Sequence, residues 1–191
     1  GNTIGGTTGL TSGACTGACN TIAANAGAGI RGDGSGTKNA FRANSVYLNG
    51  ALGIDIGPLG VTPNDDKDPD TGFNNLQNFP VIADVTWDGT NITVNGTLNS
   101  NPGVNNYTIE LFANDAPDAS GYGQGKVWLA SATGVNTDAN GNANWQIVVP
   151  GKWRFLAATA TTSDGNSSEF SQVFDPTYPP PDSDGDGYPD S

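Results

Sequence analysis

Apolar and polar residues alternate with a period of two along the second half of the chain. From Pro80 onward, alternating runs are separated by turn sequences such as Asp88-Gly89 and Asn140-Gly141. This period is typical of half-buried β-strands, whose side chains point to opposite faces in turn. The predicted strands are Val81–Trp87 (with Val81, Ala83, Val85 and Trp87 on one face), Ile92–Leu98, Tyr107–Ala113, Val127–Val135, Ala143–Val149, Leu156–Ala160 and Phe170–Phe174. Seven short strands predict an immunoglobulin-like β-sandwich over residues 79–175.

The first 57 residues follow a different pattern, in which short segments repeat. Residues 20–30 superpose on residues 44–54 at a shift of 24 residues. The shift aligns similar residue types: Asn20 with Asn44, Ile22 with Val46, Asn25 with Asn49, Gly29 with Gly53 and Ile30 with Ile54. Residues 1–6 and 38–44 look like further strands of the same stack. Such units bury their aliphatic residues only by stacking, with Asn side chains at the turns. This predicts the terminal coils of a right-handed parallel β-helix over residues 1–57 in an all-β protein.

The first coil of such a stack exposes an edge at its outer end. Unpaired backbone groups on that edge invite another strand. We expect either earlier coils of a longer chain or another subunit to cover it, and the sequence leaves both alternatives open. The chain contains no Met and shows no signal peptide, which indicates a mature or trimmed piece of a longer protein.

Residues 58–78 form a linker between the two patterned regions. It is rich in Pro, Asn and Asp, and its acidic residues are Asp65, Asp66, Asp68 and Asp70. One interpretation is a solvated acidic loop. The other is a Ca²⁺ clamp that fixes the angle between the domains, because carboxylate oxygens are the hard ligands that Ca²⁺ prefers.

Residues 176–191 form a Pro-rich tail that ends in DSDGDGYPDS. Asp182, Asp184 and Asp186 occupy the first, third and fifth ligand positions of a calcium loop, and Asp190 occupies the ninth. No helix leads into this loop and its twelfth position is missing, so the pattern is not that of an EF-hand sensor. We expect it to bind Ca²⁺ weakly, with a Kd of about 10⁻⁴–10⁻³ M.

Composition narrows the classes of partner. Acidic residues outnumber basic ones by 19 to 7, and the net charge of −12 disfavours binding to nucleic acid or to an anionic membrane surface. No apolar run approaches the roughly 18 residues of a membrane span, so we expect no membrane insertion. Cys15 and Cys19 lie in a Gly-rich loop, where they form either a small local disulfide or free thiols.

Three short motifs suggest binding, and each has a simpler explanation. Arg31-Gly32-Asp33 is the tripeptide that some integrin ligands display, but a chance match is common in a chain rich in Gly and Asp. Residues 27–32 fit G-x-G-x-x-G, yet no helix follows, and Gly-rich turns explain the match. The four tryptophans offer a sugar-stacking platform, although inward-facing parity places Trp87 and Trp145 in the core and leaves Trp128 and Trp153 as candidates.

The sequences around the linker carry a resemblance to a known class of proteins. The segments concerned are Leu52–Gly57, Gly60–Asp65, Asp70–Gly72, Asn74–Val81, Ser120–Gly123, Thr137–Ala143 and Asp164–Ser171. They look like large secreted bacterial proteins in which a parallel β-helix precedes an immunoglobulin-like sandwich. The acidic tail resembles the first turn of a thrombospondin type 3 calcium repeat. The resemblance implies a secreted or cell-surface multidomain protein, often adhesin-like, with no catalytic residues to carry over.

These observations favour a non-enzymatic structural module of a surface protein or extracellular filament, stiffened by Ca²⁺ and able to self-associate through its open end. The alternative is an adhesin that binds a glycan or host receptor through its loops or through Arg31, Gly32 and Asp33. A polysaccharide lyase fragment is the third hypothesis. It requires a groove across several coils, which two or three coils hardly supply, and the chain has no His and no G-x-S-x-G motif.

Overall fold

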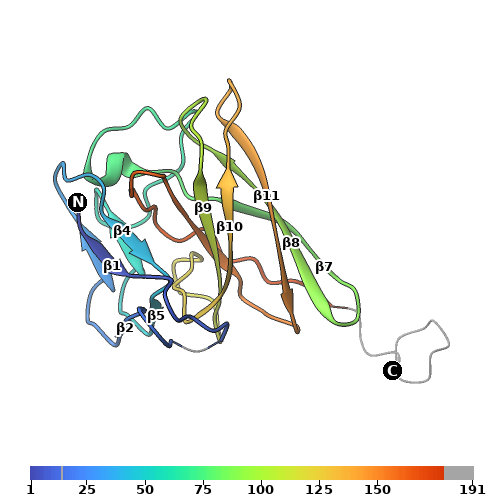
Figure 1. Cartoon of the computed structure of the whole chain (residues 1–191). Helices are drawn as coiled ribbons and strands as arrows, with labels where there is room; N and C mark the ends of the chain where they lie inside the picture. The colour runs from blue at the N-terminus through green and yellow to red at the C-terminus, as the bar shows by residue number, and fades with distance from the viewer. Residues whose placement is uncertain (14, 179–191) are drawn as a thin grey trace, which may run out of the picture.

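The computed structural model describes residues 1–13 and 15–178 of the chain. Apart from one 3₁₀ turn at Phe73–Leu76 (η1), the regular structure of these residues is β-strand, so the all-β prediction is confirmed. Five small sheets form among them, three of two strands and two of three strands. The short strands lie on one side of the molecule and the long strands on the other (Figure 1). No helix in the described residues is long and apolar enough to cross a membrane.

The two-stranded sheets are parallel and come from the first 57 residues. They pair β1 (Thr3–Gly5) with β4 (Ala40–Arg42), β2 (Thr21–Ala23) with β5 (Ser45–Tyr47), and β3 (Ile30–Gly32) with β6 (Ile54–Ile56). Ile22 lies beside Val46 and Ile30 beside Ile54, which is the 24-residue shift predicted from the sequence. Thr3 lies beside Ala40 at a shift of 37, so 13 additional residues loop out between β1 and β2.

The three-stranded sheets are antiparallel, with strand orders β11-β8-β7 and β10-β9-β12. Their strands are β7 (Val81–Trp87), β8 (Asn91–Asn99), β9 (Tyr107–Ala113), β10 (Val127–Val135), β11 (Asn142–Pro150) and β12 (Ala157–Thr161). The predicted strand at 170–174 is present only as isolated bridges. This segment runs beside β12, but the hydroxyls of Ser168 and Ser171 accept the N–H groups of Ala160 and Ala158 in place of backbone carbonyls.

The first strand of this half departs from the predicted alternation. Val81 was expected to face the core with Val85 and Trp87, but its side chain is 48% exposed and Ile82 is buried instead. The register of β7 against β8 shifts between Ile82 and Asp84. A β-bulge of this kind places two consecutive residues opposite one partner and reverses the facing of those beyond it. Val85 and Trp87 therefore still pack on the core, whereas Val81 does not.

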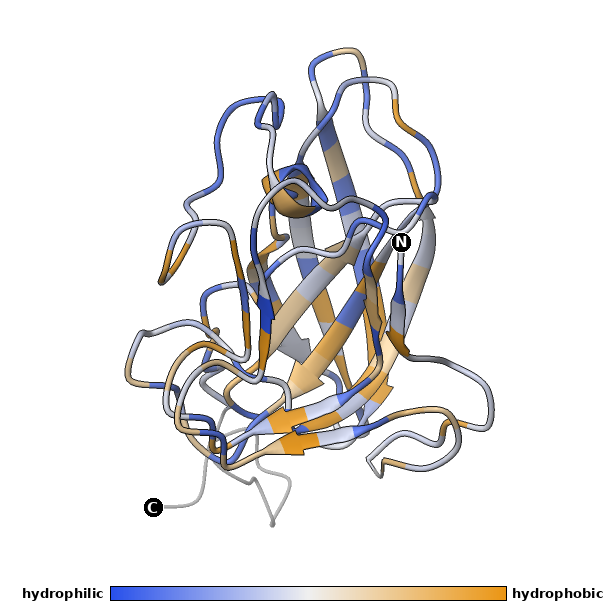
Figure 2. Cartoon of the chain, turned by 90° about the vertical axis from the view of Figure 1, so that its left-hand side faces the viewer, coloured by the Kyte–Doolittle hydropathy of each residue, from blue (hydrophilic) through white to orange (hydrophobic). Residues whose placement is uncertain are grey.

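Two clusters of buried side chains make up the interior. The larger fills the space between the three-stranded sheets, where the inward residues of β8, β9 and β11 meet. The second joins the short strands to the sheet β10-β9-β12, and it consists of Ile30, Phe41, Val46, Ile54, Ile56, Phe112, Ala157 and Phe170. Figure 2 views the short strands from their own side and shows hydrophobic stretches along them. The two halves of the chain therefore share one interior.

The shared interior predicts that both halves lose stability together. Phe170→Ala removes a buried ring whose centroid lies 5.2 Å from that of Phe112, and we expect it to cost about 3–5 kcal/mol. Urea unfolding followed by tryptophan fluorescence and by far-UV circular dichroism should show coincident transitions at a lower midpoint, although every Trp lies in the three-stranded sheets or the loops beside them. Val148→Ala, on an exposed face, is the control. Separate transitions by fluorescence and by circular dichroism in Phe170→Ala would show that the halves are independent.

Candidate functional site

The most distinctive polar residues lie where the short strands meet the second sheet. We call this contact, between residues 38–76 on one side and β9, β12 and residues 124–126 and 166–171 on the other, the junction. The two glutamates of the chain, Glu110 and Glu169, are both buried there. A buried carboxylate is costly unless hydrogen-bond donors surround it. The partners of these two side chains therefore show what the junction does.

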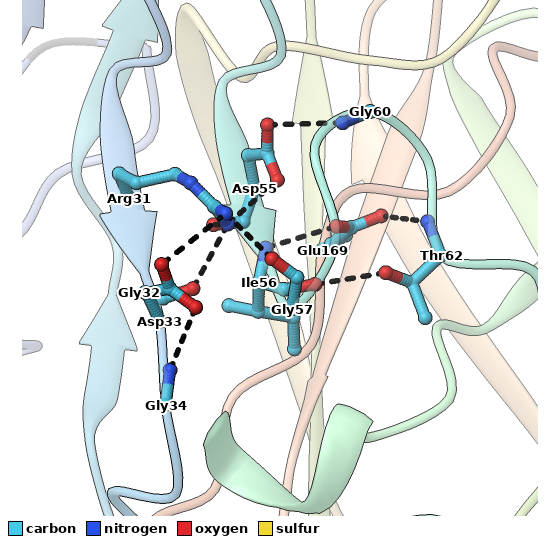
Figure 3. Close-up of polar contacts among 10 residues, drawn as sticks. All are labelled: Arg31, Gly32, Asp33, Gly34, Asp55, Ile56, Gly57, Gly60, Thr62 and Glu169. Atoms are coloured by element: carbon cyan, nitrogen blue, oxygen red, sulfur yellow. Dashed lines mark hydrogen bonds and ion pairs between the residues drawn. The ribbon is translucent and has the colours of Figure 1, made fainter. Parts of the chain in front are cut away.

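Glu169 binds the turn that follows β6 (Figure 3). Its Oε1 accepts the N–H of Ile56 at 2.9 Å, and its Oε2 accepts the N–H of Thr62 at 3.0 Å. The hydroxyl of Thr62 in turn donates to the carbonyl of Ile56 at 2.8 Å. Burial raises the pKa of Glu169 to about 7, although the two backbone N–H groups oppose the shift. One carboxylate thus fastens both ends of a turn to the C-terminal half of the chain.

Glu110 likewise binds a backbone N–H, at the corner between β4 and β5. Its Oε2 accepts the N–H of Ala43 at 3.1 Å, and its Oε1 lies 3.2 Å from Nε of Arg42. The Arg42 N–H is not aligned with that oxygen, so this contact is an ion pair without a hydrogen bond. Burial raises the pKa of Glu110, and the charge of Arg42 acts in the opposite direction. Ala43 itself has a φ of 53°, a strained corner that the carboxylate holds in place.

Side-chain amides also bind backbone N–H groups of neighbouring short strands, in rows that we call the amide ladders. In each ladder, one asparagine donates its backbone N–H and its Nδ2–H to the side-chain oxygen of the next, at 2.8–3.2 Å. The three ladders are Asn2–Asn39–Asn74, Asn20–Asn44 and Asn25–Asn49–Gln124. Asn74 and Gln124 come from outside the repeat, so the linker and the second half of the chain end two of the ladders.

The arginine of the Arg31-Gly32-Asp33 tripeptide is partly exposed, but its guanidinium is bound within the protein. Arg31 lies in β3, and its Nη1 donates to Oδ1 of Asp55 at 3.0 Å and to the carbonyl of Gly32 at 2.9 Å (Figure 3). Its Nη2 donates to the carbonyl of Gly57. Asp33 is exposed and lies 3.9 Å from the guanidinium. The guanidinium therefore crosses from β3 to β6, and this arrangement gives the receptor-binding interpretation no support.

The linker is held to the sheets rather than hinged. Asn64 and Phe79 exchange a pair of hydrogen bonds at 2.7 and 2.9 Å. Asp68 is buried, and its carboxylate accepts the hydroxyl of Ser100 at 2.5 Å and the N–H of Asn78 at 3.2 Å. Burial raises the pKa of Asp68 to about 6. These contacts give the linker a fixed path along the edge of the sheets.

The acidic residues of the linker differ in exposure, and after burial itself the nearby charges of Asp65 and Asp70 also raise the pKa of Asp68. Asp68 turns into the protein, whereas Asp66 is exposed and Asp65 and Asp70 are half-buried. Within residues 1–13 and 15–178, no group of three or more His, Cys, Asp or Glu side chains is arranged to hold a metal ion. The calcium clamp at the linker therefore stays a prediction. The tail residues Asp182, Asp184, Asp186 and Asp190 lie outside the residues that the structure describes.

The remaining candidate residues, the two cysteines and the tryptophans, make contacts within the protein. Cys15 and Cys19 are joined in a disulfide, with Cα atoms 5.7 Å apart. Trp145 is buried between the sheets, and Trp128 packs against the junction. Trp153 donates its indole N–H to the carbonyl of Pro150. Trp87 and Trp153 both contact Tyr178: the ring centroids of Trp87 and Tyr178 lie 6.3 Å apart, and the N–H of Trp153 donates to the Tyr178 hydroxyl at 3.2 Å.

No protein-family model matches the chain, so the function has to be argued from the geometry of the site. The residues that organise the junction, Glu110, Glu169, Asn74 and Gln124, were missed by reasoning from the sequence. One signal was available: the only two glutamates stand beside apolar residues, in Ile109-Glu-Leu and Glu-Phe170. All four side chains bind backbone or other side chains of the stack and its turns, so the site fastens the two halves of the chain together.

The raised pKa of Glu169 predicts a pH dependence of stability. The folded protein holds this proton up to about pH 7, whereas an unfolded glutamate loses it near its ordinary value of 4.5. Stability should therefore fall as pH rises from about 4.5 to about 7, by on the order of 3 kcal/mol. Asp68 acts in the same direction, up to about pH 6. Urea midpoints measured from pH 5 to pH 8 test this expectation.

The stability of the Glu169→Gln variant should depend less on pH than that of the original chain, whatever the variant's stability at a single pH. Asp33→Asn changes an exposed carboxylate, with 81% of its side chain accessible, and should retain the pH dependence. An unaltered pH dependence in Glu169→Gln would contradict the assignment of this buried proton. Below pH 4, stability should instead fall as pH falls. Hydrogen bonds lower the pKa values of Asp88, Asp118 and Asp175, so protonating these carboxylates favours the unfolded chain.

Proposed function

We propose that this chain is a rigid, non-enzymatic structural module of a secreted or cell-surface bacterial protein or extracellular filament. In this proposal, residues 1–57 are the terminal coils of a right-handed parallel β-helix and residues 79–175 an immunoglobulin-like β-sandwich. The observation that carries it is the junction, where Glu110 and Glu169 bind the corners of the repeat inside a shared apolar interior. A fused stack and sandwich of this kind transmits force without bending between its parts.

The parallel strand pairs support the β-helix assignment. Two of them share a register of 24 residues, and the side-chain amides stack in the same register, as Asn20 on Asn44 and Asn25 on Asn49. The two antiparallel sheets facing one another across a common core support the sandwich assignment. The fixed linker argues against a hinge between them, because Asn64, Asp68 and Asn78 each bind residues outside the linker or at its end.

A load-bearing module should unfold as one mechanical unit. Single-molecule force spectroscopy on the chain, held by handles at its two ends, is expected to show one unfolding step. That step should release about 3.3–3.6 Å of contour per residue over both halves. The Phe170→Ala variant should unfold at lower force, still in one step. Two steps, with the smaller one releasing only residues 1–57, would contradict the proposal.

We assign weak Ca²⁺ binding to the tail rather than to the linker. Its alternating Asp182, Asp184 and Asp186 supply oxygen ligands at the spacing of a calcium loop. Isothermal calorimetry should detect uptake with a Kd of about 10⁻⁴–10⁻³ M. The double variant Asp184→Asn, Asp186→Asn should lose it, whereas the matched linker variant Asp66→Asn should not. Uptake that persists in the tail variant would refute the assignment.

A further inference from the structure

The amide ladders have a direction, and this direction determines what the outer end of the stack can bind. Asn2, Asn20 and Asn25 form the outermost position of each ladder, which we call the outer rung. Each of them donates its backbone N–H and its Nδ2–H inward, to Asn39, Asn44 or Asn49. What remains at the outer rung is the Oδ1 atom and the second Nδ2–H of each side chain; in Asn44 and Asn49 an Nδ2–H donates outward, to the carbonyls of Ile4 and Ile22. Among the described residues, no donor reaches any of the three oxygens.

The apolar side chains at the same end are also incompletely covered. Ile4 lies beside Phe41 and Ile22 beside Val46; in each pair the inner residue is buried and the outer one half-buried. Strands β1, β2 and β3 each pair on one side only within the described residues. The outer end therefore combines free strand edges, uncovered aliphatic side chains and acceptors without donors. We call this surface the end face.

We propose that the end face binds a further β-coil, whose asparagine amides donate to the outer-rung oxygens and whose backbone carbonyls accept the outer-rung Nδ2–H groups. The inference rests on the proposed function, in which residues 1–57 are terminal coils. A further coil in the same register would satisfy both kinds of group, because it repeats the contacts that Asn44 and Asn49 already make with the strands outside them. The inner end of the stack cannot serve as the donor, because Asn39 and Asn49 already donate to Asn74 and Gln124.

The loop between β1 and β2 leaves the end face open to such a coil. This loop carries the disulfide between Cys15 and Cys19. The N–H of Gly13 donates to the carbonyl of Trp128 in β10 at 3.1 Å. The loop is thereby drawn toward the antiparallel sheet. The 13 additional residues of the first coil are thus accommodated at the side of the stack.

The repeat itself specifies the sequence of the occupant. Asn39, Asn44 and Asn49 already lie one coil inward of Asn2, Asn20 and Asn25. A copy of residues 38–56 added one coil outward would therefore place its three asparagines over the outer rung. Residues 33–37 lead from β3 to the next coil. The segment 38–56 followed by 33–37 has the 24-residue length of the register and joins directly to Gly1. It is a probe that the chain provides for its own end face.

The experiment compares three proteins: the chain itself, the chain with this 24-residue coil added before Gly1, and the same extended chain with all three asparagines of the added coil changed to Ala. Thermal unfolding should give the highest Tm for the asparagine coil. The Ala coil retains the backbone and the aliphatic side chains but lacks the amide donors. We expect its Tm to be roughly 5 °C lower than that of the asparagine coil, from three lost hydrogen bonds in a domain of this size.

The outcomes separate the inference from the function on which it rests. Equal stabilisation by both coils would overturn the amide inference while leaving the stacked-coil architecture in place. No stabilisation by either coil would overturn both.

Discussion

Backbone N–H groups at the corners between the short strands need acceptors, and the rest of the structure depends on where those acceptors come from. Ala43 and Asn49 mark two such corners and Ile56 ends the last short strand; the N–H groups of these residues are bound by Glu110, Gln124 and Glu169. All three acceptors belong to the second half of the chain. A buried donor that loses its acceptor costs about 1–3 kcal/mol. The short strands are therefore incomplete without the antiparallel sheets, and the junction is a requirement of the stack.

The packing follows from the same arrangement. Three-residue strands make few backbone hydrogen bonds and bury little area, so the three parallel strand pairs gain their stability from the surface that closes them. Here Phe112 and Phe170 close them, and glycines allow the close approach. A Cβ on Gly125 would meet the ring of Phe170 at 2.5 Å, while the backbone of Gly125 exchanges two hydrogen bonds with Val46. Apolar packing and backbone hydrogen bonds thus coincide at Gly125, which explains how the junction can be rigid although it is narrow.

Local patterns predicted much of this fold. The alternation in Ala143–Val149 and the repeat of Ile22 on Val46 are short-range features that the structure retains. The bulge after Ile82 was not predictable, because it depends on the register of a neighbouring strand. The roles of Glu110 and Glu169 were hidden for a related reason, since their partners lie 67 and 113 residues away in sequence. A buried carboxylate and a solvated one look alike until the chain is folded around them.

The central claim is that the junction is as stable as the core of the sheets. Native-state hydrogen exchange, measured by NMR at several urea concentrations, tests it most directly. The amides of Ala43, Asn49 and Ile56 should exchange only through global unfolding, with the same opening free energy as Ile147 in β11 and the same dependence on urea. Exchange of the three junction amides at a much lower opening free energy, with Ile147 still fully protected, would show that the stack detaches from the sheets and would contradict the account.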